Sequence, residues 1–127
     1  EKAEIEKKER NLEFKKTGDE FLEDLRKCRA IIASAGFTLM SEALYLRKPY
    51  FAIPLKGQFE QTLNALFLKQ EGLGDFNEEL RKEDVERFLL NLGKYKEKLK
   101  SFKMNPRDAV EVLGRAISRF GRKPQVY

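Results

Sequence analysis

The sequence contains no histidine and no tryptophan, and it has a single cysteine among its 127 residues. Without histidine the chain cannot form a serine–histidine or cysteine–histidine catalytic pair, nor an imidazole metal ligand. Because Cys28 has no second cysteine to pair with, we expect a reducing, cytoplasmic environment. No apolar run approaches the roughly 18 residues of a membrane-spanning helix.

What is present is enough hydrophobic and charged material for one domain with a core. Hydrophobic residues make up 41% of the chain, with ten phenylalanines, and charged residues make up 37% with a net charge of +5. The mixed signs do not call for a nucleic-acid partner. The most basic stretch runs from Lys94 to Lys103. A solvated helix face explains it, and contact with anionic lipid head groups or an acidic partner is the alternative.

Short apolar runs alternate with amphipathic segments along the chain. Strands are expected near residues 11–17, 30–34 and 50–55, with a short one at 74–76. Helices are expected after Asp19, from Thr38 to about Arg47, and over residues 59–72, 82–92, 94–102 and 105–120. This order predicts an α/β fold, a Rossmann-like parallel sheet with helices on both faces. We interpret residues 1–10 as a charged helix tail or linker and residues 11–127 as one domain.

The first candidate site follows the strand at 30–34. Ala35 and Gly36 let a ligand approach the backbone closely, and the helix that starts near Phe37 offers unpaired N–H groups. With the hydroxyls of Ser34 and Thr38, this turn is a candidate phosphate site. Tight packing of strand against helix is the alternative explanation.

Two further groups of polar residues are expected at the same edge, because ligands of parallel sheets lie beyond the carboxyl ends of the strands. Glu42 lies one turn into the helix, where a carboxylate accepts hydrogen bonds from a ribose diol; an ordinary exposed helix glutamate is the alternative. After the next strand come Gln58, Glu60, Gln61 and Asn64, which suit sugar hydroxyls or form merely a polar helix start.

The stretch "SAGFTLMSEALYLRKPYFAIPLKGQFEQTLNALFLKQEGLG" resembles the donor-binding half of GT-B glycosyltransferases. It is most similar to family 28, the lipid-linked N-acetylglucosaminyltransferases, and to the UDP-glycosyltransferase group. The shared pattern is a small-residue turn, a hydroxyl residue, a helix glutamate, a Lys-Pro pair, a strand ending in proline, an acid–glutamine pair and an asparagine. These positions are Ala35, Gly36, Thr38, Glu42, Lys48, Pro49, Pro54, Glu60, Gln61 and Asn64.

The resemblance implies a role for each site residue. The turn from Ser34 to Thr38 is expected to hold the diphosphate, Glu42 the ribose, and the Gln58–Asn64 group the donor sugar. The family's chemistry is inverting transfer from a nucleoside diphosphate sugar, with no metal and no cofactor. Ser34 stands where many relatives in the UDP-glycosyltransferase group carry histidine.

The resemblance also implies what this sequence does not contain. An N-terminal acceptor domain usually supplies the catalytic base, so the catalytic residues are unknown here, and we expect the chain to be inactive alone. A non-catalytic subunit that completes its site with a partner chain remains an alternative, as does a sugar-nucleotide epimerase of the same fold. Relatives with lipid-linked acceptors raise the prospect of peripheral membrane contact.

Overall fold

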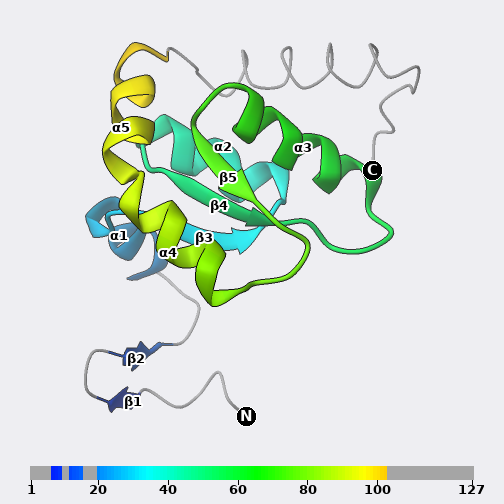
Figure 1. Cartoon of the computed structure of the whole chain (residues 1–127). Coiled ribbons are helices and arrows are strands. Elements are labelled where there is room, and N and C mark those ends of the chain that lie inside the picture. The colour runs from blue at the N-terminus through cyan, green and yellow to red at the C-terminus, as the bar shows by residue number, and fades with distance from the viewer. Residues whose placement is uncertain (1–6, 10–11, 16–19, 103–127) are drawn as a thin grey trace.

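The computed structural model describes residues 7–9, 12–15 and 20–102, and its centre is a parallel three-stranded sheet (Figure 1). The strands are β3 (Ile31–Ser34), β4 (Tyr50–Ile53) and β5 (Gly74–Phe76), in the order β3-β4-β5. In the register, Ile32 lies beside Phe51, and Phe51 beside Asp75. The predicted α/β, Rossmann-like fold is confirmed.

Helices cover both faces of this sheet. Successive strand residues point to opposite faces, and the neighbours of β4 follow that alternation. Tyr50 and Ala52 belong to the buried cluster formed with α2 (Phe37–Tyr45) and α3 (Phe59–Gln70). Phe51 instead packs edge-on against Phe88 of α4 (Lys82–Leu90), with ring centroids 5.6 Å apart.

The other two helices in the described part of the chain flank this core. α1 (Glu20–Lys27) precedes β3, and α5 (Leu92–Ser101) follows α4 and crosses the end of the sheet where the strands begin (Figure 1). Leu99 anchors α5 in the core at 1% exposure. No helix in the described ranges is both long and apolar enough to span a membrane.

The central strand is buried as its sequence predicts, and β3 is less so. Tyr50, Phe51 and Ala52 have no exposed surface. In β3, by contrast, Ile32 is 40% exposed and Ser34 is exposed. β3 is therefore less covered than β4, and within the described residues it is an edge strand.

The N-terminal strands form a separate antiparallel pair. β2 (Leu12–Phe14) confirms the predicted strand, but it pairs with β1 (Lys7–Glu9) instead of joining the parallel sheet. We expected a helix tail or linker over residues 1–10, and within it Lys7–Glu9 is extended. Pairing with the adjacent β2 satisfies backbone groups that an isolated strand leaves open.

Helix boundaries follow the sequence signals with small shifts. α2 ends at Tyr45 instead of near Arg47, since Arg47 adopts a left-handed φ of 61° before Pro49. Gly72 has a φ of 72° after α3, as expected for a helix-ending glycine. On α1, Leu25 is buried, but Phe21 and Leu22 are 40% and 57% exposed. The helix expected at 105–120 and Asp19, after which the first helix was expected, lie outside the described residues.

Candidate functional site

Three loops meet at the edge of the sheet where its strands end, which we call the rim. They are residues 35–36 after β3, 54–58 after β4 and 77–81 after β5. Parallel pairing brings these loops to one side of the molecule (Figure 1). The sequence prediction placed the first two there, and the third was not part of it.

Gln61 connects the first two rim loops. Its side-chain oxygen accepts a hydrogen bond from the backbone N–H of Ala35 at 3.2 Å and another from Leu55 at 3.0 Å. One residue of α3 therefore holds the loops after β3 and β4 at a set separation. This contact could not be predicted from the sequence, because Gln61 and Ala35 are 26 positions apart.

Two more side chains fix the carbonyl groups of the turn after β3. The side-chain amide of Asn64, which is buried, donates to the carbonyl of Ala35 at 2.8 Å. The hydroxyl of Tyr50 donates to the carbonyl of Ser34 at 2.6 Å, and burial raises the pKa of this phenol. Two neutral groups, an amide and a phenol, thus fix the carbonyls of this turn.

Helix α2 begins directly after this turn, so its N-terminal end lies at the rim. Gly36 is the residue before the helix, in extended conformation, and no side chain caps it. The N–H groups of the first helical turn have no intrahelical partners. Thr38, in this first turn, and Ser34, the last residue of β3, are both exposed. This geometry suits an anion.

A hollow of about 650 Å³ opens beside this helix start, between α1 and α2. Phe37, Thr38 and Glu42 all border it, so the structure brings the expected ribose ligand next to part of the expected phosphate turn. Most of the remaining wall is apolar and comes from the two helices and the residue after α2: Leu22, Leu25, Arg26, Ser41, Tyr45 and Leu46. A carboxylate beside apolar walls suits a polar ring system with hydroxyl groups.

The expected sugar-binding group divides into two pairs. Gln58 and Glu60 are exposed at the start of α3, and within the described residues Glu60 has no ion-pair partner. Gln61 and Asn64 lie further along α3 and hydrogen-bond to the backbone of the rim, as described above. None of the four borders the hollow at α2.

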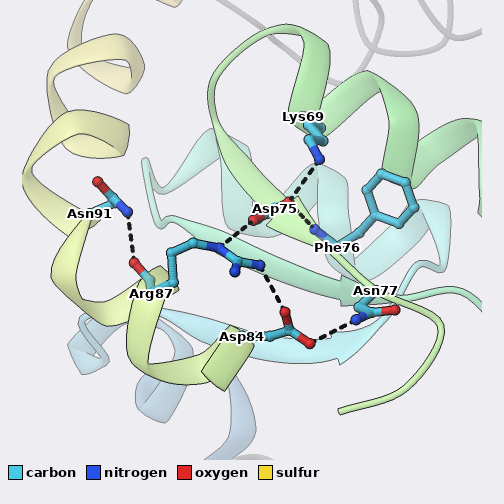
Figure 2. A network of polar contacts seen from close by, with 7 residues as sticks. All are labelled: Lys69, Asp75, Phe76, Asn77, Asp84, Arg87 and Asn91. Atoms are coloured by element: carbon cyan, nitrogen blue, oxygen red, sulfur yellow. Dashed lines mark hydrogen bonds and ion pairs between the residues drawn. The ribbon is translucent and has the colours of Figure 1, made fainter. Parts of the chain in front are cut away.

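The third rim loop is held by a network of charged residues that sequence reasoning missed (Figure 2). Asp84 accepts hydrogen bonds from the side chains of Asn77 and Arg87, each at 2.7 Å. The bond from Asn77 is the main cause that lowers the pKa of Asp84; burial opposes it and Arg87 supports it.

Asp75 joins this network from the middle of β5. Its carboxylate lies 3.8 Å from both Arg87 and Lys69, and it accepts a 2.8 Å hydrogen bond from the backbone of Phe76. In the sequence, the sign that such a network exists was the charged Asp75 within the short strand predicted at 74–76. The network attaches α4 to β5 and so sets the position of the loop between them.

The described residues contain no group of three or more His, Cys, Asp or Glu side chains placed to hold a metal ion. The single cysteine, Cys28, is partly buried, and its thiol donates to the carbonyl of Leu25 at 3.1 Å.

The fold and the rim define a Rossmann-like α/β protein whose polar groups gather beyond the strand ends, as in the GT-B glycosyltransferases. A family model described as glycosyl transferase family 1 matches residues 1–93. The chain therefore belongs to this family of glycosyltransferases, and the resemblance seen in the sequence is confirmed.

One curated relative extends the comparison. Over 67 residues, 50% of this chain, the sequence is 33% identical to UDP-N-acetylglucosamine--N-acetylmuramyl-(pentapeptide) pyrophosphoryl-undecaprenol N-acetylglucosamine transferase 3 of Bacillus cereus. The matched region is 19% of that relative, so the match spans about a fifth of the relative's length.

Proposed function

We propose that this chain is the nucleotide-sugar-binding part of an inverting glycosyltransferase that transfers a hexosyl or N-acetylhexosaminyl group. The observation that carries the proposal is the shared border of Thr38 and Glu42 on one hollow, beside an uncapped helix start. The name of the Bacillus cereus relative supports a UDP-sugar as the donor.

The diphosphate binds at the turn formed by Ser34, Ala35, Gly36, Phe37 and Thr38. N–H groups at the start of α2 and the exposed hydroxyls donate to its oxygens, and the positive end of the helix dipole favours its charge. The buried bonds from Asn64 and Tyr50 keep the turn's carbonyls from facing the anion.

The ribose binds at Glu42, whose carboxylate accepts hydrogen bonds from the diol. Glu42 is partly buried in the wall of the hollow and, within the described residues, has no ion-pair partner. Such a carboxylate stays available to a neutral ligand that donates two hydrogen bonds. The apolar remainder of the wall accommodates the faces of the nucleoside.

The donor sugar contacts the start of α3. Gln58 and Glu60 are exposed there, free to meet sugar hydroxyls. The oxygen of Gln61 already accepts two backbone hydrogen bonds, so its contribution to the sugar comes from its amide nitrogen. Asn64 contributes by holding Ala35 at the base of the site.

The chemistry that this arrangement supports is stabilisation of the leaving diphosphate. Donors fixed before the reaction stabilise charge that develops on the departing group. We assign no catalytic base to this chain and expect it in an N-terminal acceptor domain of the same protein or in a partner subunit. The exposed edge of β3 fits such a completion, because an edge strand offers unpaired backbone groups.

A role as a non-catalytic or split-enzyme subunit uses the same donor site and the same partner surface. We place the protein in the cytoplasm, where nucleotide sugars are available, with contact to the membrane surface.

The proposal is tested by a backbone-amide NMR titration of the 127-residue chain with UDP, using ADP and GDP as controls. We expect shifts at residues 35–42 and 56–64, strongest with UDP. Shifts of equal size with all three nucleotides contradict the donor assignment. Shifts confined to other parts of the chain contradict the site.

A further inference from the structure

The end of the sheet opposite the rim has a surface of its own, formed by α5 and the turns that lead into the strands. The side chain of Lys98 packs beside Gly72, just before β5, and the guanidinium of Arg47, before β4, lies 3.5 Å from the carbonyl of Lys100. Helix α5 therefore lies across the strand starts, and its C-terminal end contacts the α2–β4 turn (Figure 1).

This surface carries more cations than carboxylates, since its carboxylates are Glu97 of α5 and the exposed Glu71 in the turn before β5. Arg29, Arg47, Lys94, Lys96 and Lys98 have no carboxylate within ion-pair distance among the described residues, and we call these five residues the basic end. The single carboxylate of α5, Glu97, pairs with Lys100 at 3.4 Å. An excess of this kind attracts an anionic surface.

Two exposed leucines lie beside the basic end, at the corner where α4 turns into α5. Leu90 is 86% exposed and Leu89 is 51% exposed, whereas the preceding Phe88 is fully buried. Leu90 is the most exposed of the large hydrophobic residues described. Leu90 lies four positions before Lys94, so a partner that contacts both must offer negative charge at its surface and an apolar layer beneath it. Burying Leu90 in that layer removes its apolar surface from water.

We propose that the basic end and Leu89–Leu90 dock on an anionic phospholipid bilayer. The cations meet the lipid phosphates, and the leucines enter the boundary between head groups and acyl chains. A nucleic acid would neutralise the cations but leave the leucines in water, so the structure favours the lipid surface. This inference identifies the surface for the membrane contact named under the proposed function, and it holds or fails independently of donor binding.

The docked orientation has a consequence for the rim. Because the strands of the sheet are parallel, a bilayer at their starts leaves the rim on the far side, open to water. Soluble nucleotide sugars therefore reach the candidate donor site while the protein is on the membrane.

The test is co-sedimentation of the whole chain with phosphatidylcholine vesicles, with and without phosphatidylglycerol, at low and at raised salt. Each cation near an anionic surface contributes roughly fivefold to partitioning. Lys94→Glu with Lys98→Glu should lower binding to the anionic vesicles by more than about tenfold. The matched control is Arg81→Glu with Lys82→Glu, the same charge change at the rim end of α4, which should bind nearly as well as wild type.

The leucines are tested separately with Leu90→Ser, which should lower binding roughly fivefold at both salt concentrations. Its control is Leu80→Ser, a 54% exposed leucine in the third rim loop.

Failure to bind anionic vesicles at low salt overturns the inference, and so does an equal loss with the α4 control. Binding to a soluble polyanion that matches vesicle binding and is unchanged by Leu90→Ser identifies a nucleic-acid or other polyanion surface instead. UDP-dependent amide shifts measured on the Lys94/Lys98 variant separate failure of this inference from failure of the donor site.

Discussion

The side-chain oxygen of Gln61 accepts a hydrogen bond from the backbone N–H of Ala35 at 3.2 Å, across 26 positions of sequence. Because the same oxygen also accepts from Leu55 at 3.0 Å, a single amide holds two strand-end loops together. The turn that we assign to the diphosphate is therefore organised before any ligand arrives, which reduces the ordering that binding requires.

Replacing Gln61 should destabilise the fold more than replacing the exposed Gln58. Gln61→Ala leaves the fully buried N–H of Ala35 without an acceptor, at a cost of about 1 to 3 kcal/mol in the free energy of unfolding. Gln61→Glu keeps the acceptor oxygens and should cost less. Urea denaturation measures both, with the exposed Gln58→Ala as a control expected to stay within about 0.5 kcal/mol. A Gln61→Ala variant as stable as this control would show that the bridge does not hold the rim.

Two glycines should respond to alanine in opposite directions. A Cβ on Gly74 would collide with the backbone carbonyl of Tyr50, because β5 and β4 approach closely there. Gly74→Ala should therefore cost at least about 3 kcal/mol or prevent folding. Gly93 lies in α5 with open space around its Cβ position, so Gly93→Ala should stabilise by about 0.5 to 1 kcal/mol. Circular dichroism during urea unfolding gives both values, and a tolerated Gly74→Ala would contradict the close approach of the two strands.

Acid should weaken the network around Asp84. Its folded-state pKa lies below the ordinary aspartate value, chiefly because Asn77 donates to the carboxylate. The ionised group thus stabilises the fold above its unfolded-state pKa, and that contribution disappears as the pH falls through the lowered folded-state pKa.

We expect the urea midpoint to drop as the pH falls below about 5, with a smaller drop in Asp84→Asn. Glu79→Gln, which removes an exposed carboxylate paired with Arg81 at 3.3 Å, is the control and should follow the wild-type pH profile. Identical profiles for wild type and Asp84→Asn would show that the carboxylate contributes no acid-dependent stability.

The order of helices and strands was predictable because each element carries its own periodicity and end signals. The run from Tyr50 to Ile53 is apolar on both faces, as a central strand requires, and the structure places it there. The coverage of β3 was not predictable, since it depends on which strands lie beside it. The same holds for β2, whose alternating pattern fits either sheet and whose partner is β1.

The sequence was enough to predict which loops form the candidate site. It was not enough to predict the hydrogen bonds within it. Spacing places the turn at Ala35 and the start of α3 on one rim. It does not reveal that Gln61 and Asn64 bond to backbone groups, because those contacts arise only when α3 folds back against β3. The Asp75–Arg87 contact, between residues 12 positions apart, likewise follows from the packing of α4 against the sheet.

The most direct test of the donor site is calorimetric titration of UDP and 2′-deoxy-UDP into the wild-type chain and into Glu42→Ala. If Glu42 accepts hydrogen bonds from the ribose diol, Glu42→Ala should lose roughly tenfold to hundredfold in UDP affinity. The variant should then bind UDP and 2′-deoxy-UDP almost equally, because both changes remove the same interaction. Glu86→Ala, the same substitution on the exposed face of α4, should bind UDP as wild type does. Equal UDP affinity in wild type and Glu42→Ala would contradict the assignment of this hollow as the donor site.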